Sequence, residues 1–220
     1  MNFPLEDYAS LIFDCDGVLL NSNPIKTRAF YKATLPYGED AARSMVDYHL
    51  SNGGISRYEK FNYFLTEIVS SEQKGPNKEE LLEYFAREVR KGLLSCEITP
   101  GLQELRIGTS HAKWFVISGG NQNELHHVFK ERGLEDFFDG GIFGSPDSKD
   151  DIMSKEMGNG NICLPALFLG DSKYDYDTSL RAGVEFIFVS DWSEFVGWRR
   201  FFAGRSNVIG KLVQLTETGG

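Results

Sequence analysis

The chain has 220 residues, 41% of them hydrophobic and 25% charged, which suits one sizeable packed domain or one domain with a smaller insert. The formal net charge of −9 argues against a general binder of nucleic acid or of anionic membranes, because there is no basic excess to meet a phosphate lattice. A few local cations would still suffice to bind one small anion.

The cysteines and the first residues bear on cellular location. Cys15, Cys96 and Cys163 are widely spaced and form no CxxC pair, which predicts reduced thiols. The stretch MNFPLEDYAS has neither the basic nor the apolar region of a signal peptide, and no apolar run approaches the ~20 residues that span a bilayer. We therefore expect a cytoplasmic protein with no membrane partner.

Five short apolar runs predict strands that are buried on both faces, as in parallel sheets. They are SLIF (10–13), KWFVIS (113–118), GGIFGS (140–145), ALFLG (166–170) and EFIFVS (185–190). Helical segments lie between the later runs, and Asn121 followed by Glu124 predicts the start of one that Gly133 ends. The alternation predicts an α/β fold with a parallel sheet and with ligand chemistry at the carboxyl ends of its strands.

Residues 23–96 interrupt this alternation. They contain no clear strand but four amphipathic stretches, at 24–35, 39–50, 56–69 and 78–94. Asn77 and Glu80 form a capping pair before the last of these. We predict a helical domain over residues 23–96, inserted into a core made of residues 1–22 and 97–220.

Two aspartates follow the first predicted strand. Because strand side chains alternate between faces, Asp14 and Asp16 point the same way, about 6 to 7 Å apart, and their repulsion would be relieved by a metal ion or a shared proton. The alternative is that they only form a turn, as DG often does. Asp171 and Asp175 follow the 166–170 run in the same manner, and two acidic strand ends favour a hard divalent cation, most simply Mg²⁺. Acidic residues that merely favour a helix start are the alternative there.

Two further segments carry candidate anion ligands. Ser118 ends a predicted strand, and Gly119 and Gly120 would let the backbone approach a phosphate; a plain glycine turn is the alternative. Lys149 could steady the charges of such a site, or could be a solvated surface lysine, and Lys155 competes with it for the same role.

Together these segments resemble the haloacid dehalogenase superfamily of phosphotransferases. DCDGVLLNS, Ser118 in VISGG, Lys149 in GSPDSK and GDSKYD are similar to its four motifs, in the same order from Leu11 to about Gly183. The resemblance implies a Rossmann-like sheet core with an inserted four-helix cap. Within the insert, GGISRYEKF resembles the specificity loop of the β-phosphoglucomutase and phosphoglycolate phosphatase branch, which implies that Arg57 lies near the substrate. The alternative is that Ser56 caps a helix and Arg57 is simply exposed.

The resemblance also implies roles for individual residues. Asp14 would attack phosphorus to form an aspartyl-phosphate, and Asp16 would act as general acid and then base. Mg²⁺ would be bound by Asp14, the Asp16 carbonyl and Asp171, with Asp175 as a ligand or an orienting group. The candidate phosphate ligands are Ser118, Gly119 and Lys149.

The function that this resemblance implies is a Mg²⁺-dependent phosphatase for a small phosphorylated metabolite, such as a sugar or sugar-acid phosphate. The protein would be a monomer or a small homo-oligomer, with no nucleic-acid partner. A phosphomutase and a non-catalytic phosphometabolite binder are the alternatives. An acid/base aspartate at Asp16 argues against the dehalogenases and ion pumps of the superfamily.

Overall fold

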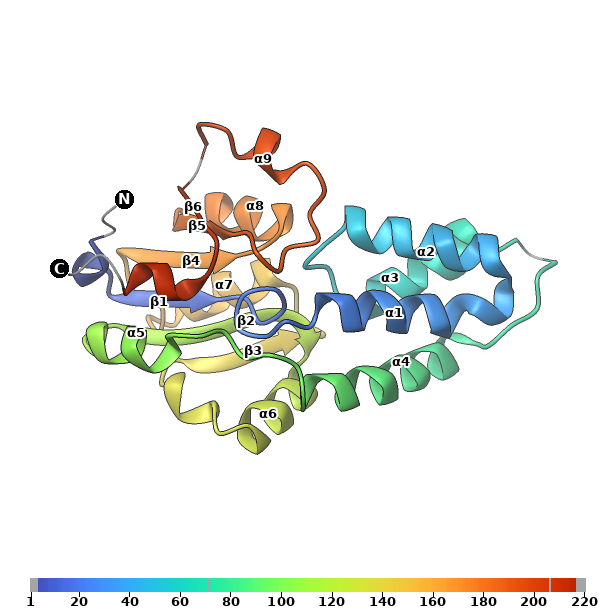
Figure 1. Cartoon of the computed structure of the whole chain (residues 1–220), viewed down its shortest axis with the longest axis horizontal. Helices are drawn as coiled ribbons and strands as arrows, with labels where there is room; N and C mark the ends of the chain where they lie inside the picture. Colours follow the sequence, from blue (N-terminus) through green and yellow to red (C-terminus); the bar gives the residue numbers. More distant parts are fainter. Residues whose placement is uncertain (1–3, 71, 206, 217–220) are drawn as a thin grey trace.

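A six-stranded, wholly parallel sheet forms the centre of the fold in a computed structural model that describes residues 4–70, 72–205 and 207–216. Its strand order is β3-β2-β1-β4-β5-β6 (Figure 1). The strands are β1 (Ser10–Phe13), β2 (Lys113–Asn121), β3 (Gly141–Ser145), β4 (Ala166–Gly170), β5 (Glu185–Val189) and β6 (Asn207–Ile209). The five predicted strands and the α/β class are confirmed, whereas β6 was not predicted. The chain winds outward on both sides of β1, so the sheet has a switch point there, and a crevice for ligands is expected at its carboxyl edge.

The register of β1 brings the candidate residues to that crevice. Phe13 lies level with Val116 of β2 and Leu169 of β4, and the amide of Asp14 donates to the Leu169 carbonyl over 2.9 Å. The residues that follow β1 and β4 therefore emerge side by side. Beyond Ile117 the pairing of β2 with β3 shifts register, so Gly119 and Gly120 lie in an irregular extension of the strand and not in the plain glycine turn that was the alternative.

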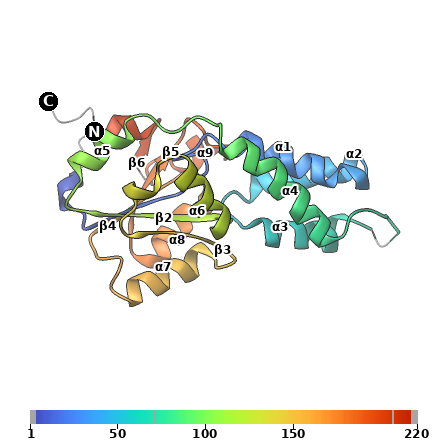
Figure 2. The same ribbon diagram turned by 90° about the horizontal axis from the view of Figure 1, so that it is seen from below.

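Helices cover both faces of the sheet (Figure 2). On the face that includes Leu11 and Phe13, the core is completed by α5 (Leu102–Gly108), α6 (Gln122–Glu131) and the 3₁₀ turn η5 (Leu212–Leu215). Opposite lie α7 (Lys149–Gly158), α8 (Lys173–Ala182) and the aromatic segment around α9 (Trp198–Phe201). Two further 3₁₀ turns are η1 (Leu5–Asp7) and η4 (Glu135–Phe137). Asn121 caps α6 by accepting from the amide of Glu124, as predicted.

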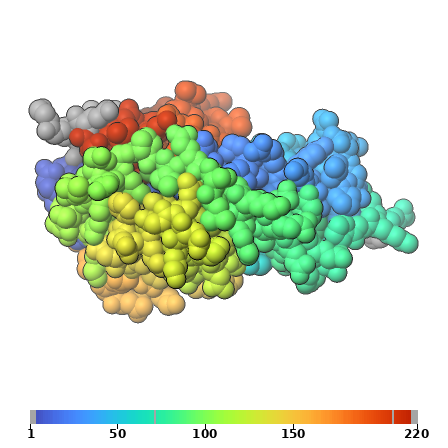
Figure 3. Space-filling model, turned by 60° about the horizontal axis from the view of Figure 1, so that its bottom comes forward, coloured from blue at the N-terminus to red at the C-terminus, as the bar shows by residue number. Residues whose placement is uncertain are grey.

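The insert is a group of helices beyond the carboxyl edge of the sheet (Figure 1), and in the space-filling view it projects from one end of the rest of the molecule (Figure 3). They are α1 (Asn23–Thr34), η2 (Leu35–Tyr37), α2 (Glu39–Ser51), α3 (Arg57–Tyr63), the π turn η3 (Phe64–Ile68) and α4 (Lys78–Leu93). These match the predicted helices to within about two residues, except that the third ends in the π turn. Phe30, Phe61 and Phe85 are buried among them and form three mutual ring contacts.

The chain enters and leaves this group of helices at one place. The amide of Asn21 donates to the Glu97 carbonyl over 2.9 Å, and the amide of Thr99 donates to the Leu19 carbonyl over the same distance. No helix among the described residues is long and apolar enough to cross a membrane.

Candidate active site

Three buried carboxylates converge at the carboxyl edge of the sheet. Asp14 follows β1, Asp171 follows β4, and Asp175 lies in the first turn of α8; one carboxylate oxygen of each lies within 4.8 Å of the others. All three side chains are buried, and Asp14 is only 2% exposed. Such a concentration of negative charge away from water requires cations.

Lys149 supplies one of these cations. Its Nζ lies 2.8 Å from Oδ1 of Asp14 and 2.5 Å from Oδ1 of Asp175, and its side chain is 1% exposed. Burial alone would lower the pKa of Lys149, but the two carboxylates outweigh it and raise that pKa. Lys155, on the same helix, is exposed. The geometry therefore favours Lys149 over Lys155 as the lysine of this site.

Asp175 is fully engaged within the protein. One oxygen pairs with Lys149, and the other accepts hydrogen bonds from the hydroxyl of Ser172 over 2.6 Å and from its amide over 3.1 Å. This capping arrangement follows from the Ser172–Asp175 spacing at the start of α8. Asp175 is therefore placed to orient Lys149.

Asp14 and Asp171 retain oxygen atoms that could bind a cation. Burial raises the pKa of Asp14 to about 7. The charges of Asp175 and Asp16 add to this effect, and Lys149 opposes it. Burial, then Asp14 and Asp175, raises the pKa of Asp171 well above its usual value. One lysine cannot neutralise three carboxylates, and a hard divalent ion with oxygen ligands matches the remaining charge and donor type. The residues present thus fit Mg²⁺.

Asp16 lies on the loop after β1 and, with Asp14 and Asp171, lines a cavity at this edge of the sheet. The Ser22 hydroxyl donates to Oδ1 over 2.5 Å, and the ammonium of Lys26 pairs with Oδ2. Burial would raise the pKa of Asp16, but Lys26 and Ser22 lower it overall. Gly17 follows with φ +77°, and a Cβ there would lie 2.1 Å from Oδ2 of Asp171, so only glycine fits.

The predicted phosphate-binding segment lies at the end of β2. Ser118 is fully buried and accepts a hydrogen bond from the Gly120 amide over 3.0 Å. Gly119 lines the cavity, and a Cβ on it would lie 2.3 Å from the carbonyl oxygen of Gly54 in the insert. The backbones of the core and the insert therefore lie so close here that a side chain at residue 119 would collide with the insert.

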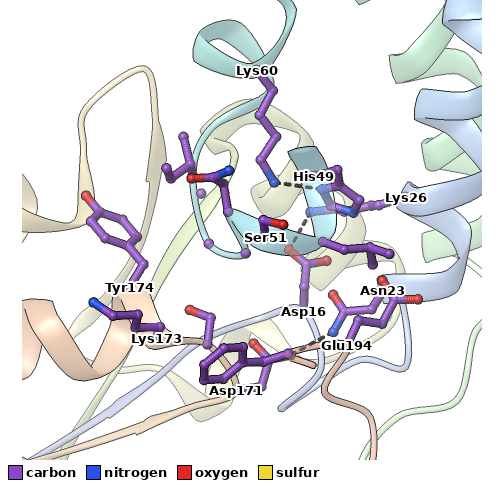
Figure 4. A pocket seen from close by; sticks show the side chains of 18 of the residues that line it. Asp16, Asn23, Lys26, His49, Ser51, Lys60, Asp171, Lys173, Tyr174 and Glu194 are labelled. Atoms are coloured by element: carbon purple, nitrogen blue, oxygen red, sulfur yellow. Dashed lines mark hydrogen bonds and ion pairs between the residues drawn. The ribbon is translucent and has the colours of Figure 1, made fainter. Parts of the chain in front are cut away.

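A cavity of about 230 Å³ separates the aspartates from the insert. Figure 4 shows side chains from both parts of the chain pointing into it, with Asp16 and Asp171 on one side and Lys60 on the other. The lining residues that sequence reasoning missed include Asn23 and Lys26, which contact the predicted carboxylates. The signal was their place in the first turn of α1, directly after the loop that carries Asp16.

Arg57 also lines this cavity, but it is not free. Its guanidinium forms a buried ion pair with Glu124 of α6 and lies 4.6 Å from the centre of the Phe85 ring. Ser56 caps α3 by accepting from the Glu59 amide, as the alternative reading proposed, but the expectation that Arg57 would then be exposed is wrong. Arg57 ties the insert to the core.

Comparisons with known proteins place the chain in a family. The model of the haloacid dehalogenase-like hydrolases matches residues 11–189. The chain belongs to this family. No curated protein matches the sequence significantly.

Several solved structures are similar to the chain. A protein provisionally named phosphoglycolate phosphatase from Lactobacillus plantarum shares 18% identity with a TM-score of 0.71, over 96% of this chain and 99% of that one. A provisionally named β-phosphoglucomutase from Thermotoga maritima shares 21% identity with a TM-score of 0.64, over 94% and 96%. CbbY from Rhodobacter sphaeroides, solved with phosphate, shares 15% identity with a TM-score of 0.69, also over 94% and 96%. At these identities the likeness supports the Rossmann-like fold.

Proposed function

We propose that this haloacid dehalogenase-like protein is a Mg²⁺-dependent phosphatase that hydrolyses a small phosphorylated metabolite. The observation that carries the proposal is the buried Asp14 carboxylate, which is held by Lys149 at the switch point of the sheet and lines a cavity. Similar structures named for phosphoglycolate phosphatase and β-phosphoglucomutase, and one solved with phosphate, support phosphoryl chemistry.

Asp14 is the proposed nucleophile. One of its oxygens accepts from the Cys15 amide over 2.8 Å and pairs with Lys149, so its orientation is fixed. Attack of the carboxylate on phosphorus would form an aspartyl-phosphate and release the alcohol of the substrate. Water would then attack phosphorus, releasing inorganic phosphate and restoring Asp14.

Asp16 is the proposed proton carrier for both steps. It would give a proton to the leaving alcohol and later take one from the attacking water. Ser22 and Lys26 hold its two oxygens, which keeps the carboxyl group turned toward the cavity. The use of Asp16 as acid in the first step requires that it be protonated when the phosphate ester is bound.

The remaining polar groups would bind the phosphoryl group and neutralise its negative charge. Mg²⁺ would be held by Asp14, Asp171 and the Asp16 carbonyl, and it would neutralise charge on the transferring phosphoryl group. Lys149 would add a fixed positive charge, with Asp175 orienting it. The Gly119 backbone would contact the phosphoryl oxygens, and the buried Ser118 hydroxyl would support that loop.

The insert would act as a cap. Its helices cover the carboxyl edge of the sheet, and the cavity beneath them, about 230 Å³, is smaller than the ~300–1,000 Å³ usual for drug-sized ligands. A small substrate, such as a sugar or sugar-acid phosphate, fits this space, whereas a phosphorylated protein does not. Closure of a cap also excludes water from the reacting groups.

Release of inorganic phosphate tests the proposal. The wild-type protein and Asp14→Asn are compared on small organic phosphates, with Mg²⁺ and with a chelator, and circular dichroism confirms that the variant is folded. We expect Mg²⁺-dependent release that Asp14→Asn reduces by at least about 10³-fold. A folded Asp14→Asn protein within a few-fold of wild type would refute the nucleophile. Isomer interconversion primed by a sugar bisphosphate, in place of release, would identify a phosphomutase instead.

A further inference from the structure

The cavity is lined by four lysine or arginine side chains, and three of them already have carboxylate partners among the described residues. The pairs are Lys26 with Asp16, Arg57 with Glu124, and Lys173 with Asp177. Lys60 of α3 is the exception. Within the described parts of the chain, its one hydrogen-bond partner is Nδ1 of His49, 2.7 Å from its Nζ.

Lys60 is buried among the apolar core of the insert. Its side chain is 2% exposed and lies on the Phe30 ring, with Nζ 5.6 Å from the ring centre. Burial, together with the charge of Lys26, lowers the pKa of Lys60 to about 7, although Asp16, Asp171 and Glu194 act in the opposite direction. A buried lysine without a counter-ion is unfavourable, so a compensating role is expected.

His49 fixes the direction in which Lys60 can bind an anion. Burial and the nearby lysines lower the pKa of His49 well below its usual value, so the ring is neutral. Its Nδ1 accepts from the ammonium, which leaves two further N–H groups of Lys60. Figure 4 shows Lys60 reaching from α3 toward His49, on the side of the cavity opposite Asp171.

We propose that Lys60, oriented by His49, binds a carboxylate of the substrate, so that the natural substrate is a small phosphorylated carboxylic acid. This inference rests on the proposed function, because it assumes that the phosphate group occupies the aspartate side of the cavity. A neutral sugar phosphate would leave the Lys60 ammonium without a counter-ion.

The single positive charge of Lys60 favours a carboxylate over a second phosphate group. Lys60 offers one positive charge, which a carboxylate monoanion neutralises, whereas a phosphate dianion would need a second cation. The other three cations of the cavity are engaged with carboxylates. A charged hydrogen bond of this kind corresponds to a preference of about 10- to 100-fold in kcat/KM over a matched neutral substrate.

Matched substrate pairs test the inference. The kcat/KM for 3-phosphoglycerate is divided by that for glycerol 3-phosphate, and the value for 2-phosphoglycolate by that for ethylene glycol monophosphate. Propane-1,3-diol bisphosphate, which carries a second phosphate group in place of the carboxylate, tests whether Lys60 prefers phosphate. The ratios are measured for wild type, for Lys60→Met, and for Lys173→Met as a matched control whose lysine lines the same cavity but is exposed.

We expect both wild-type ratios to exceed about 10, Lys60→Met to bring them near 1, and Lys173→Met to leave them as in wild type. Wild-type ratios near 1, or Lys60→Met lowering both members of each pair equally, would overturn the inference, as would a preference for the bisphosphate. If phosphate is released but the wild-type ratios are near 1, only the carboxylate site is refuted, and the phosphatase proposal stands.

A binding measurement separates the two proposals. Calorimetric titration of Asp14→Asn with 3-phosphoglycerate and glycerol 3-phosphate reports affinity without turnover. Tighter binding of the acid, lost in Asp14→Asn/Lys60→Met, would support the carboxylate site even if no phosphate were released by wild type. Equal affinities would overturn it.

Discussion

Replacing Lys60 by methionine should change how the stability of the ligand-free protein depends on pH. The substitution keeps the length of the side chain and removes a charge that is buried against Phe30 with no carboxylate partner among the described residues. Below pH 7 the folded protein carries that charge at a free-energy cost, whereas the unfolded chain carries it in water.

The pKa of Lys60 sets the magnitude. Lowering it from 10.5 to about 7 makes the charged form less favourable in the folded protein by about 5 kcal/mol. Between these two values the unfolded chain binds more protons, so the free energy of unfolding of wild type rises with pH. The penalty is complete below about pH 7 and fades toward pH 10.5. Lys60→Met removes this penalty but also loses the hydrogen bond to His49, which offsets the gain in stability by about 1 to 3 kcal/mol.

Urea unfolding at pH 6.5 and pH 9 measures the effect. Lys60→Met should be more stable than wild type at pH 6.5 by about 2 to 4 kcal/mol, and this advantage should shrink by about 2 to 3 kcal/mol at pH 9. The groups that face Lys60, namely Lys26, His49, Asp16, Asp171 and Glu194, are present in both proteins, so their titration largely cancels in the difference. A stability difference between Lys60→Met and wild type that does not change with pH would refute the reasoning. For Lys173→Met, we expect no pH-dependent stability difference from wild type.

Three other substitutions test the rest of the site. Gly119→Ala would put a methyl group 2.3 Å from the Gly54 carbonyl oxygen, so it should push the insert away from β2 and lower kcat/KM by at least about tenfold in a phosphate-release assay. Arg57→Met leaves Glu124 buried without its partner and should lower the free energy of unfolding by about 3 to 5 kcal/mol in urea. Asp171→Asn removes a buried carboxylate, so it should stabilise the metal-free protein and abolish the rise in melting temperature on adding Mg²⁺. In wild type, a Mg²⁺ concentration of one hundred times Kd should raise the free energy of unfolding by about 2.7 kcal/mol.

Each substitution has an informative control or contrary result. Gly108→Ala adds a methyl group in open space and should leave kcat/KM unchanged; equal losses in both glycine variants would refute the contact argument. Adding Glu124→Met to Arg57→Met should restore most of the lost stability, and no recovery would show that the ion pair is not the cause. An unchanged Mg²⁺ response in Asp171→Asn would remove that residue from the metal site.

The sequence predicted those parts of the fold that depend on local pattern. Strands such as 10–13 and 166–170 were predicted to the residue, because continuous apolar runs bounded by polar turns leave little choice. β6 was missed because it has only three residues, Asn207–Ile209, and is held in place by pairing with β5 at the sheet edge. The π turn at 64–68 likewise carries no pattern distinct from that of the helix before it.

The candidate site was predictable on the core side only. Asp14, Asp171 and Lys149 could be placed together because strand ends meet at one edge of a parallel sheet. The partners supplied by the insert could not, because the contact of Lys26 with Asp16 depends on how the insert packs against the core. Pairing of Arg57 with Glu124, 67 residues away in the chain, has the same origin.

The adjacent entry and exit of the insert separate its connection to the core from its contents. Residues 21 and 97 are hydrogen-bonded through their backbones, as are residues 19 and 99, so these connections depend on no side chain of residues 23–96. The entropy of closing a loop grows only with the logarithm of its length, so an insert of different size would alter the stability of the core little. Grafting the insert of a relative between these points should therefore change the ligand preference of the cavity while Asp14 stays in place, when the graft also supplies cationic partners for Asp16 and Glu124.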